Sequence, residues 1–154
     1  MRVITTEQIL KLVGEKKIFI EGYSPDGLSG QDTYTFHLGR CRWQIMSAGE
    51  IDGRKPKNII RANYALDDEG FALHCGQFAL FETAEVIKLD SRTVCWLSTH
   101  PKMAQLGLDF LQSSWLVPPG SEGRLTLETS NRGPCTVRLF PGMQVVKAMF
   151  YDIG

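Results

Sequence analysis

Short apolar runs, separated by turn-forming residues, recur along the whole sequence. The runs occupy residues 18–20, 34–38, 42–46, 71–73, 78–81, 93–97, 124–128, 136–139 and 145–151. Groups of Pro, Gly, Asn and Asp lie between them, at residues 24–27, 67–70, 118–120, 131–134 and 141–142. Such groups favour tight turns, because Pro fixes φ and Gly accepts a positive φ. Many short strands joined by turns are typical of a β-sandwich or a closed β-barrel, so we expect a mainly β protein.

Two segments depart from this strand pattern and predict short helices. Thr5 is followed three positions later by Gln8, the spacing of a capping box, and apolar residues then recur at helical spacing up to Gly14. Residues 101–107 begin with Pro and end with Gly, which are preferred at the start and just past the end of a helix. We therefore expect an N-terminal helix and one short internal helix.

Length and charge predict one domain over residues 1–154 that binds neither nucleic acid nor a membrane. A chain of this length can bury on the order of 70% of its extended surface in one core. The 17 basic and 17 acidic residues cancel. The short basic run at residues 54–57 contains Pro beside Gly53 and is interpreted as a solvated loop. No segment therefore provides the concentrated positive charge that attracts phosphate backbones or anionic lipids.

The cysteines and the hydropathy pattern bear on cellular location. Cys41, Cys75, Cys95 and Cys135 are far apart and form no Cys-x-x-Cys pair, so we expect buried thiols and no metal site. No run approaches the ~20 apolar residues that a membrane span needs, and the first residues do not have the form of a secretion signal. The expected location is cytoplasmic.

One acid lies in an otherwise apolar strand that follows the turn at 118–120. Leu125 and Leu127 alternate with Thr126 and Glu128, so Glu128 is expected to point away from the leucine face. The simpler interpretation is that Glu128 belongs to the polar side of a half-exposed sheet. The other is that a glutamate held on a rigid strand beside a cleft, with its pKa raised by partial burial, acts as general acid and base.

Several motifs share their order and spacing with one known family. They lie at residues 4–9, 18–20, 34–39, 73–80, 83–89 (Thr-x-Glu-x-Ile-x-Leu), 123–131 (Gly-x-Leu-Thr-Leu-Glu-x-Ser-Asn) and 139–143 (Leu-Phe-Pro-Gly-Met). In this order they resemble the dCTP deaminase branch of the trimeric dUTPase superfamily. The resemblance implies a dUTPase-like distorted β-barrel or sandwich. It also implies a homotrimer, because the active sites of the family are built between subunits.

The resemblance also implies which residues would act on a deoxyribonucleotide such as dCTP. In the family, the acid of the Leu-Glu-x-x-Asn motif shuttles protons during deamination of cytosine, and Glu128 occupies that position. The residues that the resemblance implies for substrate binding are Lys102, Gln105, Ser113, Ser114, Trp115, Gly120 and Asn131. The chemistry requires no zinc, and no tightly bound cofactor is expected beyond Mg²⁺ carried by the substrate phosphates.

Six positions depart from the family pattern, and two of them, Pro101 and Lys102, stand where the family has two serines that hold the triphosphate. Gln105 replaces an arginine that binds phosphate, Leu116 replaces an arginine that assists the water, and Pro118 replaces the aspartate that activates water in dUTPases. Thr35 stands where an early strand usually has an aspartate. The sequence also ends at Gly154, directly after its last strand, where the family continues into a tail that closes over the nucleotide. We therefore expect water exclusion and phosphate binding to come from elsewhere or to be absent.

Three functions remain open from the sequence. The first is a dCTP deaminase-like enzyme with Glu128 as proton shuttle. The alternative is a catalytically degenerate member of the fold that binds nucleotides or proteins in a regulatory or structural role. The third, a dUTPase-type nucleotide pyrophosphatase, is disfavoured by Pro118.

Overall fold

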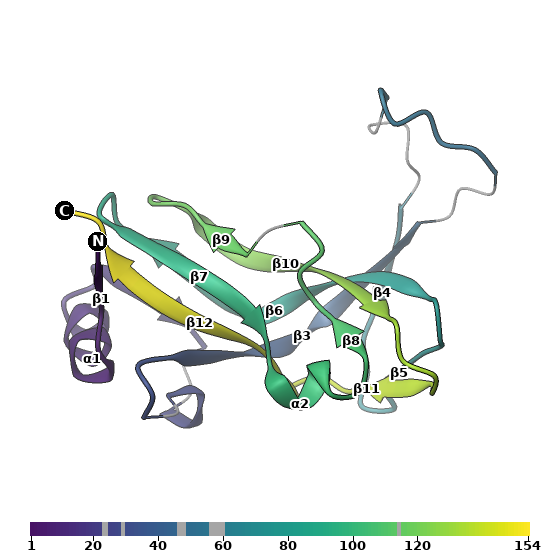
Figure 1. The fold of residues 1–154 in the computed structure, drawn as a ribbon, viewed down its shortest axis with the longest axis horizontal. Coiled ribbons are helices and arrows are strands. Elements are labelled where there is room, and N and C mark those ends of the chain that lie inside the picture. Colours follow the sequence, from purple (N-terminus) through teal and green to yellow (C-terminus); the bar gives the residue numbers. More distant parts are fainter. Residues whose placement is uncertain (23–24, 29, 46–48, 56–60, 114) are drawn as a thin grey trace.

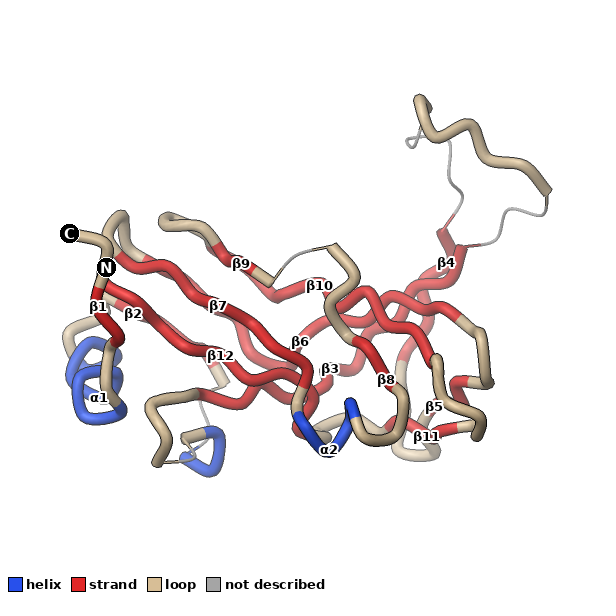
Figure 2. Tube along the Cα trace, in the orientation of Figure 1, coloured by secondary structure: helices blue, strands red, loops and turns tan. Residues whose placement is uncertain are grey.

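The structure, a computed structural model, describes residues 1–22, 25–28, 30–45, 49–55, 61–113 and 115–154. The fold is mainly β, with an N-terminal helix and a short internal helix, as the sequence predicts (Figures 1 and 2). In chain order the elements are β1 (Arg2–Val3), α1 (Thr6–Gly14), β2 (Ile18–Glu21), the 3-10 turn η1 (Pro25–Gly27), β3 (Tyr34–Ile45), β4 (Arg61–Ala65), β5 (Phe71–Leu73), β6 (Phe78–Leu89), β7 (Thr93–Thr99), α2 (Pro101–Ala104), β8 (Leu108–Asp109), β9 (Leu116–Val117), β10 (Glu122–Asn131), β11 (Val137–Leu139) and β12 (Gln144–Asp152).

The predicted capping box starts α1. The backbone N–H of Thr5 donates to Oε1 of Gln8 at 3.0 Å, and the backbone N–H of Gln8 donates to Oγ1 of Thr5 at 3.4 Å. Both bonds satisfy N–H groups that lack partners inside the helix. The buried side chain of Ile9 then anchors α1 in the core.

Ten strands of the described chain form one antiparallel sheet. Its main path is β8-β10-β6-β3-β12-β7-β9, with β1 added to β12, β2 to β6 and β4 to β3, while β5 and β11 form a separate pair. The sheet curls, so that β9 at one end of the path lies close to β10 near the other end (Figure 1). The result is a half-barrel whose two ends do not pair with each other, and this gap positions the site described below.

One strand was predicted as two. The runs at 34–38 and 42–46 belong to the single strand β3, except that Met46 lies outside the described residues. The pairing of β3 with β6 shifts register between Leu38, which pairs with Thr83, and Arg42, which pairs with Phe81. The pattern of apolar residues changes where the register shifts, which explains why the sequence suggested a break.

A bulge in β6 faces this register shift. Arg124 pairs with Val86 but Thr126 pairs with Glu82, so three residues of β6 lie opposite Leu125 alone. The hydroxyl of Thr83 accepts from the N–H of Leu125 at 3.0 Å and donates to the carbonyl of Glu85 at 2.8 Å. Because two extra residues leave the period-2 alternation intact, Glu85 stays on the inner face, where it is 1% exposed.

A buried carboxylate must have partners, and Glu85 finds them on β3. Tyr34 donates its hydroxyl to Oε1 at 3.1 Å, and the backbone N–H of His37 donates to Oε2 at 3.0 Å. Nδ1 of His37 lies 2.6 Å from Oε1, and this hydrogen bond raises the pKa of His37 above its usual value. Asp26 lies 3.8 Å from Nε2 and acts in the same direction. His37 is therefore a structural histidine in this fold.

The prediction of four buried thiols is wrong for two of them. Cys95 on β7 is buried, and burial raises the pKa of its thiol. Cys75 and Cys135 are exposed and Cys41 is half-buried. Cys75 and Cys135 lie in connections beside β5 and β11, where the chain runs over the surface. Among the described residues, no helix is long and apolar enough to cross a membrane.

Candidate functional site

The cavity beside Glu128 has a volume of about 320 Å³ and lies where the curled sheet fails to close. Its walls come from β6, β7, β9 and β10 and from the segment 110–113. Leu97, Phe110 and Leu116 make one side apolar, while β10 brings polar side chains to the other. A mostly apolar cleft with a few polar groups is the usual form of a small-molecule site.

Glu128 is held against this cavity by Ser113. The backbone N–H of Ser113 donates to Oε2 of Glu128 at 2.8 Å, and its hydroxyl donates to Oε1 at 2.8 Å. Both carboxylate oxygens are thus fixed by charge-assisted hydrogen bonds, which are stronger than neutral ones. Glu128 itself is half-buried.

Strand pairing explains why Ser113 and Glu128 meet. Asp109 and Leu108 of β8 pair with Ser130 and Asn131 of β10, and Leu111 forms an isolated bridge with Glu128. The segment after β8 therefore runs alongside the end of β10. The two hydrogen bonds of Ser113 are used by Glu128 in this structure, and the predicted contact of Ser113 with a base stays a prediction.

The alternation predicted for β10 is confirmed. Leu127 is fully buried, whereas Arg124, Thr126 and Glu128 are on the opposite, more exposed face and line the cavity. Sequence reasoning missed Arg124 as a site residue, although its spacing from Glu128 on one strand face was the available signal.

Trp115 lies beside the cavity but is not among the residues that line it. Its side chain is 53% exposed and packs edge-to-face on Trp96, with ring centroids 4.6 Å apart. Leu116 and Pro118 do line the cavity. They stand where the family pattern has an arginine and an aspartate. The cavity therefore persists with apolar groups at both positions.

Asn131 is buried below the site, and other parts of the chain use its side chain fully. Its Nδ2 donates to the carbonyls of Leu73 at 2.9 Å and Cys135 at 2.8 Å, and its Oδ1 accepts from the N–H of Gly133 at 2.9 Å. Asn131 is 1% exposed and does not line the cavity. This geometry gives Asn131 an architectural role, and its contact with substrate stays a prediction.

Three more of the residues predicted to bind substrate, Lys102, Gln105 and Gly120, are not among the described residues that line the cavity. Lys102 on α2 and Gln105 at its C-terminal end are exposed. His100 caps α2, accepting from the backbone N–H of Lys102 at 3.2 Å. Gly120 lies in the turn before β10 with φ at 75°, and its N–H donates to the carbonyl of Asp90 at 3.0 Å. Ser114 lies outside the described residues. Substrate contacts of these four site residues stay predictions.

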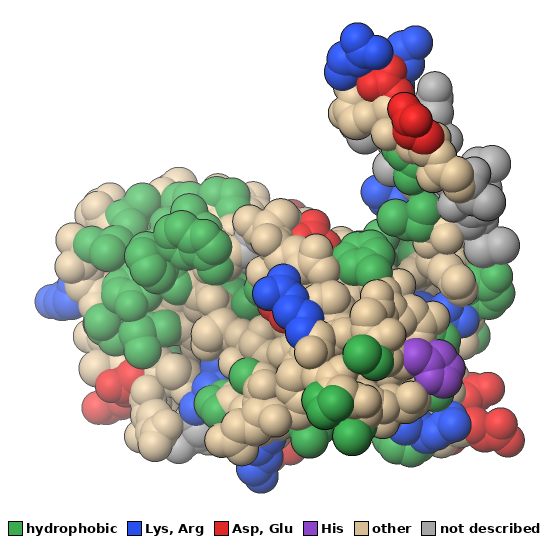
Figure 3. All heavy atoms as spheres, turned by 45° about the vertical axis from the view of Figure 1, so that its right-hand side comes forward, with side chains coloured by type: hydrophobic (Ala, Val, Ile, Leu, Met, Phe, Trp, Pro, Cys, Tyr) green, Lys and Arg blue, Asp and Glu red, His purple; other side chains and the backbone are tan. Residues whose placement is uncertain are grey.

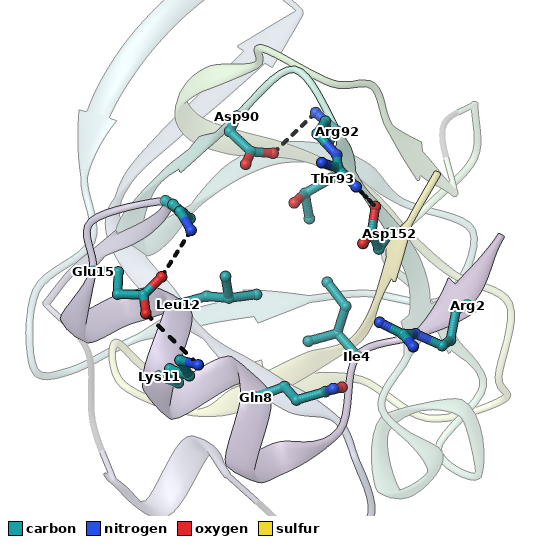
Figure 4. A pocket seen from close by; sticks show the side chains of 11 residues that line it. Arg2, Ile4, Gln8, Lys11, Leu12, Glu15, Asp90, Arg92, Thr93 and Asp152 are labelled. Carbon is teal, nitrogen blue, oxygen red and sulfur yellow. Dashed lines mark hydrogen bonds and ion pairs between the residues drawn. The ribbon is translucent and has the colours of Figure 1, made fainter. Parts of the chain in front are cut away.

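A second cavity, of about 300 Å³, lies between α1, β1, the end of β12 and the turn before β7 (Figure 4). Its acids are already paired within the chain. Glu15 lies 2.9 Å from Lys17, Asp152 lies 3.4 Å from Arg92, and Asp90 accepts from the backbone N–H of Arg92 at 3.0 Å. Because Glu15 and Asp152 are paired with cationic side chains and no β10 residue lines this cavity, we take the cavity at Glu128 as the candidate site.

The residues around Glu128 do not fit a metal ion held by the protein. Among the described residues two acids line that cavity, and one of them, Glu122, forms an ion pair with Lys88 at 2.9 Å. In the described ranges there is also no group of three or more His, Cys, Asp or Glu side chains placed to hold a metal. We therefore derive no step through a protein-bound metal.

Comparison with known proteins shows the family to which this chain belongs. A family model described as dCTP deaminase-like matches residues 3–153. The chain belongs to the dCTP deaminase-like family. A dUMP-forming dCTP deaminase from Methanobrevibacter smithii is 27% identical over 155 residues, which covers 97% of this dCTP deaminase-like chain and 80% of that protein. A second, from Bifidobacterium adolescentis, is 36% identical over 87 residues, covering 56% of this chain and 45% of that protein.

Solved structures support the same architecture for the dCTP deaminase-like chain. The 2'-deoxycytidine 5'-triphosphate deaminase from Agrobacterium tumefaciens matches with a TM-score of 0.78 and 18% identity, covering 99% of this chain and 48% of that one. This chain thus spans about half the length of that structure. A mutant dUTPase from phage phi11 of S. aureus, in which a structural Mg(II) ion is coordinated, matches with a TM-score of 0.56 and 8% identity, covering 89% of this chain and 91% of that one. Relatives with the dUTPase fold can therefore bind Mg²⁺.

Proposed function

We propose that this chain catalyses the hydrolytic deamination of a deoxycytidine nucleotide, with Glu128 as the proton shuttle. The observation that carries the proposal is the Glu128 carboxylate, held by two hydrogen bonds from Ser113 at the wall of a cavity with apolar sides. Membership of the dCTP deaminase-like family supports the choice of substrate.

One carboxylate is sufficient for the proton transfers of this reaction. Glu128 takes a proton from water as the water oxygen bonds to C4 of the cytosine ring. The C4–N3 π bond opens as the C4–O bond forms, and N3 receives this proton from Glu128. Glu128 then takes the remaining proton of the C4 hydroxyl and passes it to the amino group, so that the C4–N bond breaks, ammonia leaves and the C4=O bond forms. Proton transfer by a positioned carboxylate typically contributes 10²- to 10⁴-fold to a rate. The hydrogen bonds from Ser113 keep the carboxylate in one position throughout the reaction, so that it can face both the water and the leaving amine.

The apolar wall of the cavity suits the pyrimidine ring of the substrate. Leu97, Phe110 and Leu116 offer a surface on which a flat pyrimidine ring can lie while its exocyclic amine faces Glu128. An apolar surround also strengthens the electrostatic interactions of the carboxylate by excluding bulk water.

We further propose that the active assembly is a homotrimer, in which a neighbouring subunit covers the open side of the site. Exposed aromatic side chains lie next to the cavity. Trp96 is 40% exposed and contacts both Trp115 and Tyr151, with centroids 4.6 and 5.9 Å apart. Figure 3 shows hydrophobic side chains gathered toward the end of the molecule that carries β7 and β9. Such a patch favours burial against a partner. Sedimentation equilibrium should give three times the chain mass, and a monomer would contradict the proposal.

The decisive experiment compares two glutamates of the same strand. Wild type, Glu128→Gln and the control Glu122→Gln are incubated with dCTP, and ammonia and uracil nucleotide are measured. Glu128→Gln should lose at least about 10²-fold in rate, whereas Glu122→Gln should stay close to wild type because Glu122 is paired with Lys88. Equal turnover by wild type and Glu128→Gln would refute the shuttle.

The alternative is a nucleotide-binding or protein-binding member without activity. Gln105, Leu116 and Pro118, which replace polar family residues, favour it. A protein that binds dCTP without turnover should still be stabilised against heat, by about 2.7 kcal/mol at a hundredfold excess over Kd. Thermal shift by dCTP without ammonia release would therefore support this alternative. Release of pyrophosphate without ammonia would instead support the third, dUTPase-type activity, for which the side chain of Pro118 offers no base.

A further inference from the structure

We propose that Arg124 binds a phosphate group of the nucleotide whose base lies against Glu128; this inference rests on the function proposed above and deepens it. Arg124 does not correspond to any of the positions from which phosphate binding was expected. It lies instead on the same strand face as Glu128 and lines the same cavity.

Charge within the cavity favours this role. Arg124 is the one cationic side chain among the described residues that line it. The other charged group at that end, Glu122, is neutralised by Lys88 at 2.9 Å. An anionic ligand group entering the cavity is therefore drawn to the Arg124 end, while Glu128 at the opposite end repels it. The two charges orient a nucleotide with its phosphates toward Arg124.

The spacing along β10 fits this orientation. The two extra residues of the neighbouring bulge belong to β6, so β10 itself stays extended. At ~3.3 Å per residue, the backbones of Arg124 and Glu128 are roughly 13 Å apart. Thr126 lies midway on the same face. Cation, hydroxyl and carboxylate thus follow one another in the order in which an extended nucleotide carries its phosphate, sugar and base.

Arg124 is also held in a fixed position. Its Nη1 donates to the carbonyls of Thr83, at 3.1 Å, and of Ala84, two residues of the bulge that have no pairing partner on β10. Its Nε lies 3.8 Å from a carboxylate oxygen of Glu82. Within the described residues Nη2 makes no hydrogen bond, and the side chain is 43% exposed. A guanidinium anchored through one nitrogen and open at another is preorganised for a phosphate oxygen.

The test measures binding, and so does not depend on turnover. Calorimetric titrations of dCTP and of deoxycytidine are compared in the Glu128→Gln background, which is expected not to turn dCTP over, with Arg124 retained and with Arg124→Gln or Arg124→Lys added. Arg124→Gln should weaken dCTP binding at least about tenfold, the scale of one charge-assisted contact, and leave deoxycytidine unchanged. Arg124→Lys should recover part of the loss. Unchanged dCTP affinity in folded Arg124→Gln would overturn the proposal while leaving deamination by Glu128 intact.

A second variant covers the case in which Arg124→Gln fails to fold because the bulge carbonyls lose their donor. Glu82→Gln removes the carboxylate that competes with phosphate for Arg124. It should bind dCTP several-fold more tightly with no change for deoxycytidine, and equal affinities would overturn the proposal. Loss of turnover in Glu128→Gln is scored separately, so a failed shuttle and a failed phosphate site give different results. A wild type that binds no dCTP would overturn both.

Discussion

Replacing Asn131 tests whether this family-motif residue holds the fold together rather than contacting substrate. Asn131→Ala removes three hydrogen bonds, to the carbonyls of Leu73 and Cys135 and from the N–H of Gly133. A hydrogen bond contributes about 1 kcal/mol net, and a buried group left without a partner costs about 1–3 kcal/mol. Leu73 is fully buried, so water cannot replace its partner, whereas Cys135 is exposed and can be rehydrated. We expect a loss of about 2–4 kcal/mol.

Asn131→Asp is a more specific test, because it keeps the shape of the side chain but replaces its NH₂ donor with a carboxylate oxygen. The carboxylate could still accept from Gly133, but its second oxygen would face two carbonyl oxygens at 2.8–2.9 Å. Burying that uncompensated charge should cost more than truncation, about 3–5 kcal/mol. Arg132→Ala is the matched control. Its guanidinium is exposed and lies 3.1 Å from Asp109, and such pairs contribute less than about 1 kcal/mol.

Urea unfolding followed by circular dichroism would measure these differences. The midpoint should fall in the order wild type, Arg132→Ala, Asn131→Ala, Asn131→Asp, at constant m-value. In thermal scans Asn131→Ala should melt about 6–12 °C lower. A change below about 0.5 kcal/mol for Asn131→Ala, or Asn131→Asp more stable than Asn131→Ala, would refute the reasoning.

Three further measurements test the bulge, the buried ion pair and the thiols. The hydrogen bond to Glu85 raises the pKa of His37 above the usual 6.5. The stabilisation from protonated His37 should therefore be complete below about pH 6.5 and be lost as pH rises through the pKa of the folded state. The urea midpoint of His37→Gln should depend less on pH than that of wild type. Gly39→Ala would place a Cβ 2.9 Å from the carbonyl oxygens of Glu82 and Thr83 at the start of the bulge, so the melting temperature of this variant should fall by several degrees. Gly14 has open space around it, so the melting temperature of Gly14→Ala should rise slightly. A thiol reagent should label Cys75 and Cys135 in the folded protein and Cys95 only after unfolding; early labelling of Cys95 would contradict its burial.

Some of this architecture follows from the sequence because its causes are local. The capping box of Thr5 and Gln8 depends on two residues three positions apart, and the orientation of Glu128 depends on alternation within one strand. The strands recognised from turn residues are likewise set by neighbours in the chain. These features needed no knowledge of which strand pairs with which.

Other features depend on pairing between distant segments, and the sequence could not supply that. Ser113 meets Glu128 only because β8 pairs with β10. Arg124 shares a face with Glu128 by alternation along β10, but it meets the carbonyls of Thr83 and Ala84 only because β6 bulges opposite Leu125. Hydrogen bonds of Asn131 reach a carbonyl 58 positions away. A local pattern fixes which way a side chain points, but the register of the sheet decides what it meets there.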